Sequence, residues 1–257
     1  MKIHVKTPEE IQVMEKGGKI LSETMWEVLK SVKPGVSELE IDALAEKLIK
    51  QKGGQPGFKK VRGYHHTICA STNDVIVHGI PTSYRLKEGD VFGVDCGVFL
   101  DGFHTDMSET IRVQKTENRR QKDKVDTFLE TGKRALNEAI KQVKPGNHIG
   151  NISQVIQQIV EKEGGYGVTR ELIGHGVGKS LHEDPPVPGY LAKRLEKTPL
   201  LVPGMVIAVE VIYNMGSRDI AFAGTDDWTI KTRDGSISGL FERTVAVTET
   251  GHKILTP

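Results

Sequence analysis

Four acidic residues lie within otherwise apolar segments of this sequence. They are Asp95 and Asp106 in VDCGVFLDGFHTD, Glu210 in MVIAVEVIY and Glu242 in SGLFERTVAV. Isolated charges in apolar surroundings are so costly that buried carboxylates normally neutralise or acquire partners. These segments contain one basic residue, Arg243, and strand alternation turns its side chain to the opposite face from Glu242. The carboxylates therefore need positive charge from a source other than lysine or arginine.

The spacing within the first segment predicts how two of these carboxylates lie. The dipeptide Asp-Gly at 101–102 is typical of a two-residue hairpin turn, which pairs the residues on either side of it. In that register Asp95 lies opposite Ser108, and Asp106 is a diagonal neighbour of Asp95 on the same face. Diagonal neighbours lie about 7–8 Å apart, which suits two carboxylates that reach one metal centre. A proton shared between two acids is the alternative, but it accounts for two of the four.

Two divalent cations would balance the charge of four carboxylates. Oxygen ligands with one imidazole suit Mn²⁺, Fe²⁺, Co²⁺ or Zn²⁺ better than an ion that prefers thiolates. Two such ions about 3.5–4 Å apart can hold and deprotonate a shared water while they polarise a carbonyl. The chemistry predicted is hydrolysis. A two-metal phosphoesterase satisfies the same charge argument, although the histidines and apolar residues near the acids fit a peptide substrate better.

An internal repeat predicts that the chain brings these residues together from two halves. VKPGVSELEIDALAEKLIKQKGG at 32–54 and VKPGNHIGNISQVIQQIVEKEGG at 143–165 share their first four residues, their length and the closing Gly-Gly. After each copy come a histidine before glycine, at His78 and His175, and then an apolar strand with an acid. We expect each half to supply one histidine and two acids to a shared centre.

The elements that must position these residues are two helical pairs and two groups of strands. Thr7, followed by proline and by Glu10, opens a helix that continues to about Val32, and Ser37 with Glu40 opens a second one. We predict further helices at 121–143 and 149–163, and strands at 75–113 and from 205 onward. Because no linker divides the chain, we expect one α+β domain over 1–257, with pseudo-repeats at approximately 7–115 and 121–250.

The composition excludes some classes of partner. Lysine and arginine number 35 against 34 acidic residues, so the net charge of +1 favours neither nucleic acid nor a charged membrane surface. The two cysteines, Cys69 and Cys96, are too few for a disulfide framework and are typical of a reducing compartment. No signal peptide is visible, and no run approaches the roughly 20 apolar residues of a membrane span. We expect a cytoplasmic protein without a membrane or specific nucleic-acid partner.

In their order along the chain, these motifs resemble those of the type I methionine aminopeptidases. The similar segments are VIVHGIP, GVDCGVFLDGFHTDMSET, GHGVGKSLHEDPPVPGY, VIAVEV and DDWTIKTRDGSISGLFERTVAVTETG. The resemblance implies the pita-bread fold, in which a pseudo-twofold α+β repeat surrounds a central antiparallel sheet. It also implies removal of the initiator methionine from nascent proteins whose second residue is small. It further implies work close to the ribosome, and we expect a monomer.

The resemblance assigns roles to the residues that match the family motifs. Asp95 would chelate one of two divalent ions, Asp106 and Glu242 would bridge both, and His175 and Glu210 would complete the other. The ions would be Co²⁺, Mn²⁺, Fe²⁺ or Zn²⁺. A water that bridges them would attack the first peptide bond, and Glu210 would carry its proton.

Other matching positions would contact the substrate. His78 and His182 would be catalytic without binding metal, near the scissile amide and the carbonyl oxygen respectively. An apolar pocket for the methionine side chain would be lined by Phe58, Tyr64, Cys69, Leu181 and Trp228. His104 is a candidate for an additional ligand, because it shares the strand face of Asp106.

Three positions depart from the family pattern, and two rival functions stay open. The departures are Leu181, Val211 and Arg243, where the family often has Phe, Pro and His; none removes a ligand. An Xaa-Pro aminopeptidase of the same fold uses the same five ligands, but such enzymes resemble longer chains with an additional N-terminal domain. A non-catalytic pita-bread binding module would have lost ligands, and all five are present here.

Overall fold

The computed structural model describes residues 3–114, 122–224 and 226–257. Its strands are β1 Gln55–Pro56, β2 Ile68–Thr72, β3 Val75–Val77, β4 Val91–Leu100, β5 Phe103–Arg112, β6 Gly167–Val168, β7 Gly174–Gly176, β8 Glu183–Val187, β9 Val206–Asn214, β10 Ile220–Phe222, β11 Ile230–Thr232, β12 Ser238–Val247 and β13 His252–Ile254. Its helices are α1 Pro8–Ser31, α2 Glu38–Gln51, α3 Lys124–Ile140 and α4 Ile149–Gln157. Short 3-10 turns occupy Phe58–Lys60 and Leu195–Lys197.

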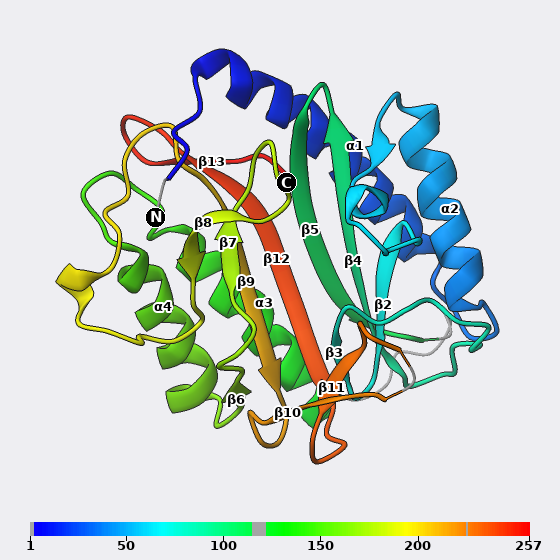
Figure 1. The fold of residues 1–257 in the computed structure, drawn as a ribbon. Coiled ribbons are helices and arrows are strands. Elements are labelled where there is room, and N and C mark those ends of the chain that lie inside the picture. The colour runs from blue at the N-terminus through cyan, green and yellow to red at the C-terminus, as the bar shows by residue number, and fades with distance from the viewer. Residues whose placement is uncertain (1–2, 115–121, 225) are drawn as a thin grey trace.

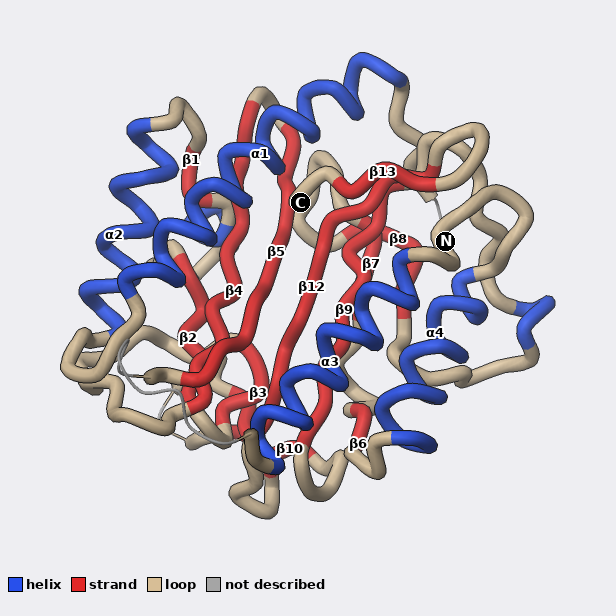
Figure 2. Tube along the Cα trace, turned by 180° about the vertical axis from the view of Figure 1, so that it is seen from behind, coloured by secondary structure: helices blue, strands red, loops and turns tan. Residues whose placement is uncertain are grey.

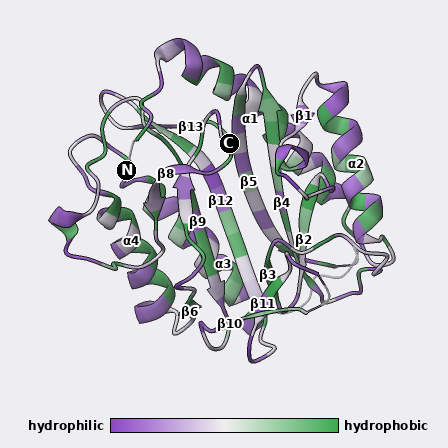
Figure 3. Cartoon of the chain, viewed as in Figure 1, coloured by the Kyte–Doolittle hydropathy of each residue, from purple (hydrophilic) through white to green (hydrophobic). Residues whose placement is uncertain are grey.

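A large antiparallel sheet forms the centre of the molecule (Figure 1). Its strand order is β1-β4-β5-β12-β9-β7-β8, and β2, β6 and β13 pair with β4, β9 and β12 respectively. A smaller sheet has the order β10-β11-β3. Hydrophilic segments interrupt β5 and β12 in the middle of the large sheet (Figure 3). These two neighbouring strands carry Asp106 and Glu242.

The four helices cover one face of the large sheet (Figure 2). One apolar cluster, which includes Leu21, Ile41 and Phe92, packs α1 and α2 against β4 and its neighbours. A second cluster, which includes Phe128 and Phe241, packs α3 and α4 against β9 and β12. These two clusters lie on the helix side of the sheet, and the opposite face carries the acids together with smaller apolar clusters. No helix among the described residues is long and apolar enough to cross a membrane.

The predicted helix starts follow from side-chain caps. Thr7 and Glu10 form the expected capping box at the start of α1, and Ser37 and Glu40 form the one that starts α2. The helix predicted at 121–143 begins at Lys124, because the Asp123 side chain accepts hydrogen bonds from the first helical backbone amides. Position 121 lies outside the described residues. The helix predicted at 149–163 is α-helical only as α4, and it continues as a π-helical stretch at Gln158–Glu163.

The hairpin of β4 and β5 has the predicted register. Leu100 pairs with Phe103 across the two-residue turn, and Asp95 pairs with Ser108. Asp101 and Gly102 have φ values of +46° and +91°, which is the left-handed pair that this type of turn requires. Asparagine, aspartate and glycine tolerate this conformation, so the local sequence determines the alignment of two ten-residue strands.

Candidate metal centre and adjoining pocket

A single row of residues crosses four strands of the large sheet. Asp95 on β4 pairs with Ser108 on β5, Ser108 pairs with Glu242 on β12, and Glu242 pairs with Glu210 on β9. Directly paired residues of an antiparallel sheet point to the same face, so these side chains project together. Asp106 precedes Ser108 by two residues and shares that face. The register thus gathers all four acids that the sequence singles out.

His175 joins the acids from β7, the strand beyond β9. Its Nε2 lies 3.3 Å from Glu210 Oε1 and 4.0 Å from Asp106 Oδ2. Its Nδ1 lies 2.7 Å from the Gly176 carbonyl oxygen, which makes Nδ1 the donor and leaves the Nε2 lone pair facing the carboxylates. Asp106, His175 and Glu242 offer ligand atoms that all lie within 4.8 Å of one another. All five candidate ligands line the same cavity.

The electrostatics of this cluster are unfavourable without a cation. Burial and then the neighbouring carboxylates raise the pKa of Asp95 and of Glu242 well above the usual range. Burial raises the pKa of Asp106 to about 7, and burial with the Asp106 charge raises the pKa of Glu210 to about 8. Burial lowers the pKa of His175 to about 3, so its imidazole is neutral and able to bind a metal.

The residues present fit divalent metal ions. Asp95 Oδ1 and Glu242 Oε1 are buried without a hydrogen-bond partner in the described part of the chain. Buried polar atoms are normally hydrogen-bonded, so two orphaned carboxylate oxygens aimed at one cluster indicate a missing partner. Carboxylate oxygens and a neutral imidazole nitrogen are ligands of Mn²⁺, Fe²⁺, Co²⁺ and Zn²⁺.

Two further histidines stand beside the acids and line the same cavity. The His182 ring lies 4.3 Å from the His175 ring, centroid to centroid, in an edge-to-face arrangement. His78 follows β3 with a φ of +57°, a conformation that few residues with a Cβ adopt. Burial, and secondarily His182, lowers the pKa of His78 to about 4, and burial also lowers the pKa of His182. Both rings are therefore neutral at neutral pH.

The five residues expected to line a methionine pocket lie together. Phe58, Tyr64, Cys69, Leu181 and Trp228 belong to one apolar cluster, in which Val61 and Ile80 also pack. The Tyr64 ring packs edge-on against Phe58 and Trp228, at centroid distances of 6.3 and 5.1 Å. This cluster borders the cavity of about 240 Å³ that the five candidate ligands also line. The structure thus places an apolar wall next to the acids.

Some cavity residues are not among the site residues that the sequence predicts. They are Val61, Val77, Glu171, Leu172, Ile173, Ile212 and Leu240. Two of them have a sequence signal, because Ile212 follows Glu210 by two residues and Leu240 precedes Glu242 by two, and alternate strand residues share a face. The others come from loops and from the small sheet, for which no periodicity in the sequence indicates direction.

His104 does not line the cavity and is not part of the candidate ligand group among the described residues. Its ring lies 4.8 Å from that of Phe99, and its backbone amide donates to Gly178. Burial, followed by the charges of His182 and Lys60, lowers its pKa to about 4. Its Nδ1 is buried without a hydrogen-bond partner in the described part of the chain, so an additional ligand at His104 stays a prediction.

The three departures from the family pattern have different surroundings. Leu181 borders the cavity, whereas Val211 is buried in the core beneath the helices. Arg243 lies on the helix side, as strand alternation predicts, and Nη1 donates to the carbonyl oxygens of Ser108 and Glu242. Its Nη2 pairs with Glu109 at 2.9 Å. None of the three displaces a candidate ligand.

Comparisons with known proteins agree with this geometry. The model of metallopeptidase family M24 matches residues 12–249. Methionine aminopeptidase 1 of Bacillus subtilis is 43% identical over 251 residues, which is 98% of each chain. A crystal structure of methionine aminopeptidase from Thermotoga maritima superimposes with a TM-score of 0.93 at 36% identity, over 99% of both chains. Prolidase from Pyrococcus furiosus has a TM-score of 0.76 at 25% identity, over 98% of this chain but 65% of its own.

Proposed function

This chain belongs to the methionine aminopeptidases of metallopeptidase family M24, and from that premise we propose that it removes the initiator methionine from nascent proteins whose second residue is small. The fold is the pita-bread fold that the sequence motifs indicate. The observation that supports the proposal best is one cavity lined by five candidate metal ligands, two neutral histidines and an apolar pocket. Because nascent proteins are the proposed substrates, we propose that the enzyme acts in the cytoplasm near the ribosome. We also propose that it is a monomer.

Asp95, Asp106, His175, Glu210 and Glu242 would hold two divalent ions, Co²⁺, Mn²⁺, Fe²⁺ or Zn²⁺. When bound, such ions polarise a carbonyl group and lower the pKa of water to about 7. The four carboxylates balance the positive charge, and the neutral His175 presents Nε2 to the cluster. Burial of these groups keeps bulk water away from the charges and so strengthens each interaction.

Glu210 is the group that we assign to proton transfer. Its side chain lines the cavity, where a carboxylate can accept a proton from the attacking water and release it again. In the proposed cycle the carboxylate takes a proton from the attacking water and delivers it to the nitrogen of the departing peptide. The amine then leaves as a neutral group, and the Glu210 carboxylate is regenerated.

His182 and His78 are assigned to the substrate rather than to metal. A neutral imidazole N–H of His182 can donate a hydrogen bond to the scissile carbonyl oxygen as negative charge develops on it. His78 lies on the same cavity and would contact the scissile amide. Donors of this kind typically contribute a factor of about 10²–10³ to kcat.

The apolar cluster of Phe58, Tyr64, Cys69, Leu181 and Trp228 would bind the methionine side chain. Burial of a methionine side chain contributes about 1.5–3 kcal/mol, which is enough to select methionine over small residues. An Xaa-Pro specificity is not favoured, because the methionine aminopeptidases match over their whole length and prolidase over only 65% of its own.

The proposal is tested by loading the metal-free protein separately with Mn²⁺, Fe²⁺, Co²⁺ or Zn²⁺ and offering Met-Ala-Ser and Ala-Pro-type peptides. We expect methionine release from the first substrate with at least one metal, and no comparable cleavage of the second. Asp106→Asn is expected to bind less metal and to lose activity. Absence of methionine release with all four metals would contradict the proposal, as would an Asp106→Asn variant with unchanged metal content and activity.

A further inference from the structure

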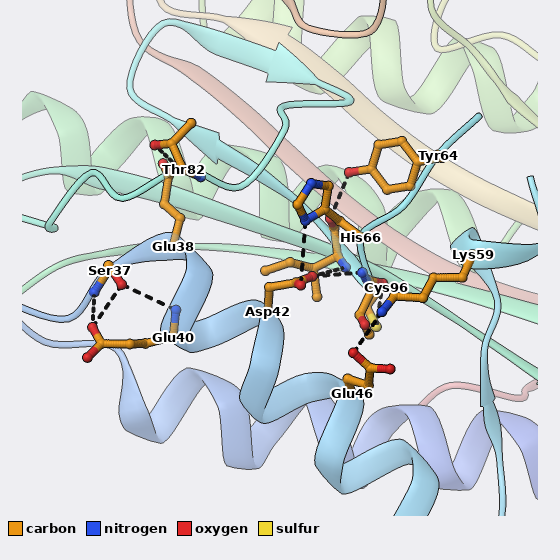
Figure 4. Close-up of polar contacts among 12 residues, drawn as sticks. Ser37, Glu38, Glu40, Asp42, Glu46, Lys59, Tyr64, His66, Thr82 and Cys96 are labelled. Carbon is orange, nitrogen blue, oxygen red and sulfur yellow. Dashed lines mark hydrogen bonds and ion pairs between the residues drawn. The ribbon is translucent and has the colours of Figure 1, made fainter.

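Helix α2 carries three acidic residues spaced four positions apart, Glu38, Asp42 and Glu46. Residues at this spacing lie on the same side of a helix, and charged residues there are usually exposed to solvent. Glu38 and Asp42 are instead only 5% and 8% exposed. Figure 4 shows Asp42 directed toward the segment that contains His66, and Glu38 directed toward Thr82. Buried acids on a surface helix need a physical reason.

Asp42 holds the backbone between two residues that line the cavity. Its Oδ1 accepts hydrogen bonds from the Thr67 amide at 2.7 Å and the Ile68 amide at 3.0 Å. The Tyr64 hydroxyl donates to the Ile68 carbonyl oxygen at 2.7 Å, so Tyr64 is tied to the same point. Cys69 is the next residue along β2. The Asp42 carboxylate thus positions the backbone that carries Tyr64 and Cys69, two residues of the apolar wall.

Glu38 holds the chain on either side of His78. Its Oε1 accepts from the Thr72 hydroxyl at 2.6 Å, and its Oε2 accepts from the Thr82 amide at 2.9 Å and hydroxyl at 2.8 Å. One turn beyond Asp42, Glu46 pairs with Lys59 at 2.7 Å, next to Phe58. Each of the three acids at this spacing therefore contacts a segment that adjoins a different cavity residue.

None of the three acids lines the cavity, and none of the five candidate ligands lies on α2; the strand that Asp42 anchors, β2, pairs with β4 through Cys69 and Asp95. The effect of the three acids on the substrate is therefore indirect and acts through the apolar wall and His78. Small displacements of such a wall change binding strongly, because a cavity recognises a side chain only in a defined geometry.

We propose that α2 holds in place the backbone segments that form the methionine pocket. Asp42 is then a positioning residue for substrate selectivity. The inference rests on the proposed function, since it takes the apolar wall as the site of the methionine side chain. Loss of the Asp42 carboxylate leaves two backbone amides without their acceptor, and the segment from Tyr64 to Cys69 then moves away from Phe58 and Trp228. Metal binding is expected to stay the same.

The test compares Asp42→Ala, Asp42→Asn and Asp234→Ala with the unmodified enzyme. Asparagine keeps an oxygen that can accept from both amides, whereas alanine removes it. Asp234 is a matched control, because its carboxylate also accepts two backbone hydrogen bonds, from Ser217 and Ser236, in a loop that does not border the cavity. Metal stoichiometry and thermal unfolding are measured for every variant.

We expect Asp42→Ala to raise KM for a methionyl peptide about tenfold, with kcat within about threefold, and to lower the preference for methionine over leucine at the first position. Asp42→Asn is expected to stay within about threefold of the unmodified enzyme in KM, and Asp234→Ala within twofold. A merely structural role of Asp42 would change stability but would leave the selectivity between methionine and leucine unchanged.

A binding measurement distinguishes failure of this inference from failure of the proposed function. Of the two tryptophans, Trp228 borders the cavity, so a Trp26→Phe background makes its fluorescence a probe of free L-methionine added to the metal-free protein. Weaker methionine binding in Asp42→Ala than in Asp42→Asn supports the inference even in a protein that cleaves no peptide. Equal methionine affinity and equal KM in folded Asp42→Ala and the unmodified enzyme would overturn it.

Asp42→Ser serves if Asp42→Ala does not fold, because its hydroxyl is too short to reach both amides. Amide hydrogen exchange at Thr67 and Ile68 then reports the anchoring directly. Exchange that is faster in Asp42→Ser than in Asp42→Asn, together with a raised KM, supports the inference. Unchanged exchange and KM would contradict it.

Discussion

At the scale of single residues, the metal centre is a problem of charge. Four carboxyl groups with raised pKa values face one another, and Arg243, the nearest cation on their strands, lies behind the sheet. Burial is the largest cause of each shift, and mutual repulsion comes second for Asp95, Glu210 and Glu242. Near neutral pH the metal-free folded protein therefore holds protons that the unfolded chain, with carboxyl pKa values of about 4, has already released.

The stability of the metal-free protein should consequently fall between about pH 6.5 and 8. A carboxyl group with a raised folded pKa stabilises the fold at pH values below its unfolded pKa of about 4, and this contribution is lost as the pH rises through the folded pKa. For Asp106 and Glu210 the folded values are about 7 and 8. The buried histidines act in the opposite direction, but their effect is complete above their unfolded pKa of about 6.5.

Urea unfolding of the metal-free protein at several pH values checks this prediction. We expect a loss of about 1–3 kcal/mol between pH 6.5 and 8, from about 1.4 kcal/mol per pKa unit and group. Glu210→Gln is expected to flatten the profile, whereas Asp234→Asn, at a surface carboxyl with a lowered pKa, should leave its slope unchanged. A metal-free protein whose stability rises over this range would contradict the charge argument.

At the scale of elements, the β4 and β5 hairpin both aligns a candidate ligand and supports the apolar pocket. Its turn aligns Asp95 with Ser108, and its Gly97 allows the Phe58 ring to pack on the strand. A Cβ at position 97 would lie 2.8 Å from Phe58 Cε1 and 3.0 Å from Cδ1, which is closer than van der Waals contact permits. The same strand therefore carries a candidate ligand and supports the floor of the pocket.

Gly97→Ala should impair methionine recognition more than metal binding. The added methyl group would push the Phe58 ring into the cavity, and we expect KM for methionyl peptides to rise about tenfold with an overpacking cost of about 1–3 kcal/mol. Steady-state kinetics and metal titration check this. Gly93→Ala is the control on the same strand, since its Cβ would approach no atom closer than 3.3 Å and lies away from the cavity. Equal KM changes in both variants would contradict the explanation.

Local signals in the sequence predict the hairpin register and the helix starts. They do not predict contacts between segments that lie far apart in the chain. The Asp-Gly turn determines the hairpin register within a few residues, and the Thr7 and Ser37 caps determine two helix starts. Strand alternation places the acids on one face, but family resemblance was needed to gather the pocket residues from distant segments. Asp42 looks like an exposed helix residue in the sequence, because its partners Thr67 and Ile68 lie 25 and 26 positions away.

At the scale of the whole molecule, the candidate metal ligands come from both the first and the second half of the chain. We propose that residues of about 7–115 and 121–250 are a duplicated unit within one catalytic domain. Each half lays two helices over its own strands and has its own apolar cluster, which supports the proposal. Asp95 and Asp106 come from the first half, whereas His175, Glu210 and Glu242 come from the second. Neither half alone contains the complete set.

The two halves pair in the large sheet at β5 and β12, and in the small sheet where β3 pairs with β11. The register between β5 and β12 comprises Glu242 with Ser108 and Arg243 with Met107. On either side, threonine hydroxyls bridge the strands. Thr244 Oγ1 accepts from the Asp106 amide and donates to the Asp106 carbonyl oxygen, at 2.9 and 2.7 Å. Thr110 Oγ1 does the same for Leu240, at 3.0 and 2.7 Å.

Removal of these hydroxyls should weaken the pairing of β5 with β12 and lower the affinity for metal. Thr244→Val keeps the side-chain shape but leaves the Asp106 amide without its acceptor, at a cost of about 1–3 kcal/mol. We expect calorimetry to show at least tenfold weaker metal affinity for Thr244→Val, with a smaller effect for Thr110→Val, which is farther from the ligands. Thr131→Val, whose hydroxyl bonds within α3, serves as the control. Unchanged affinity in the double Thr110→Val and Thr244→Val variant would contradict the prediction.

Because the candidate ligands come from both halves, bound metal would also stabilise the fold mechanically. Ions held by carboxylates from both halves would cross-link β4 and β5 of the first half to β9 and β12 of the second, in addition to the backbone pairing between the halves. A ligand that binds only the folded form stabilises it by an amount that grows with the logarithm of the free ligand concentration. If the proposed ions bind, the lifetime of this protein under proteolysis would depend on metal supply, and a cell short of metal would lose the enzyme as well as its activity.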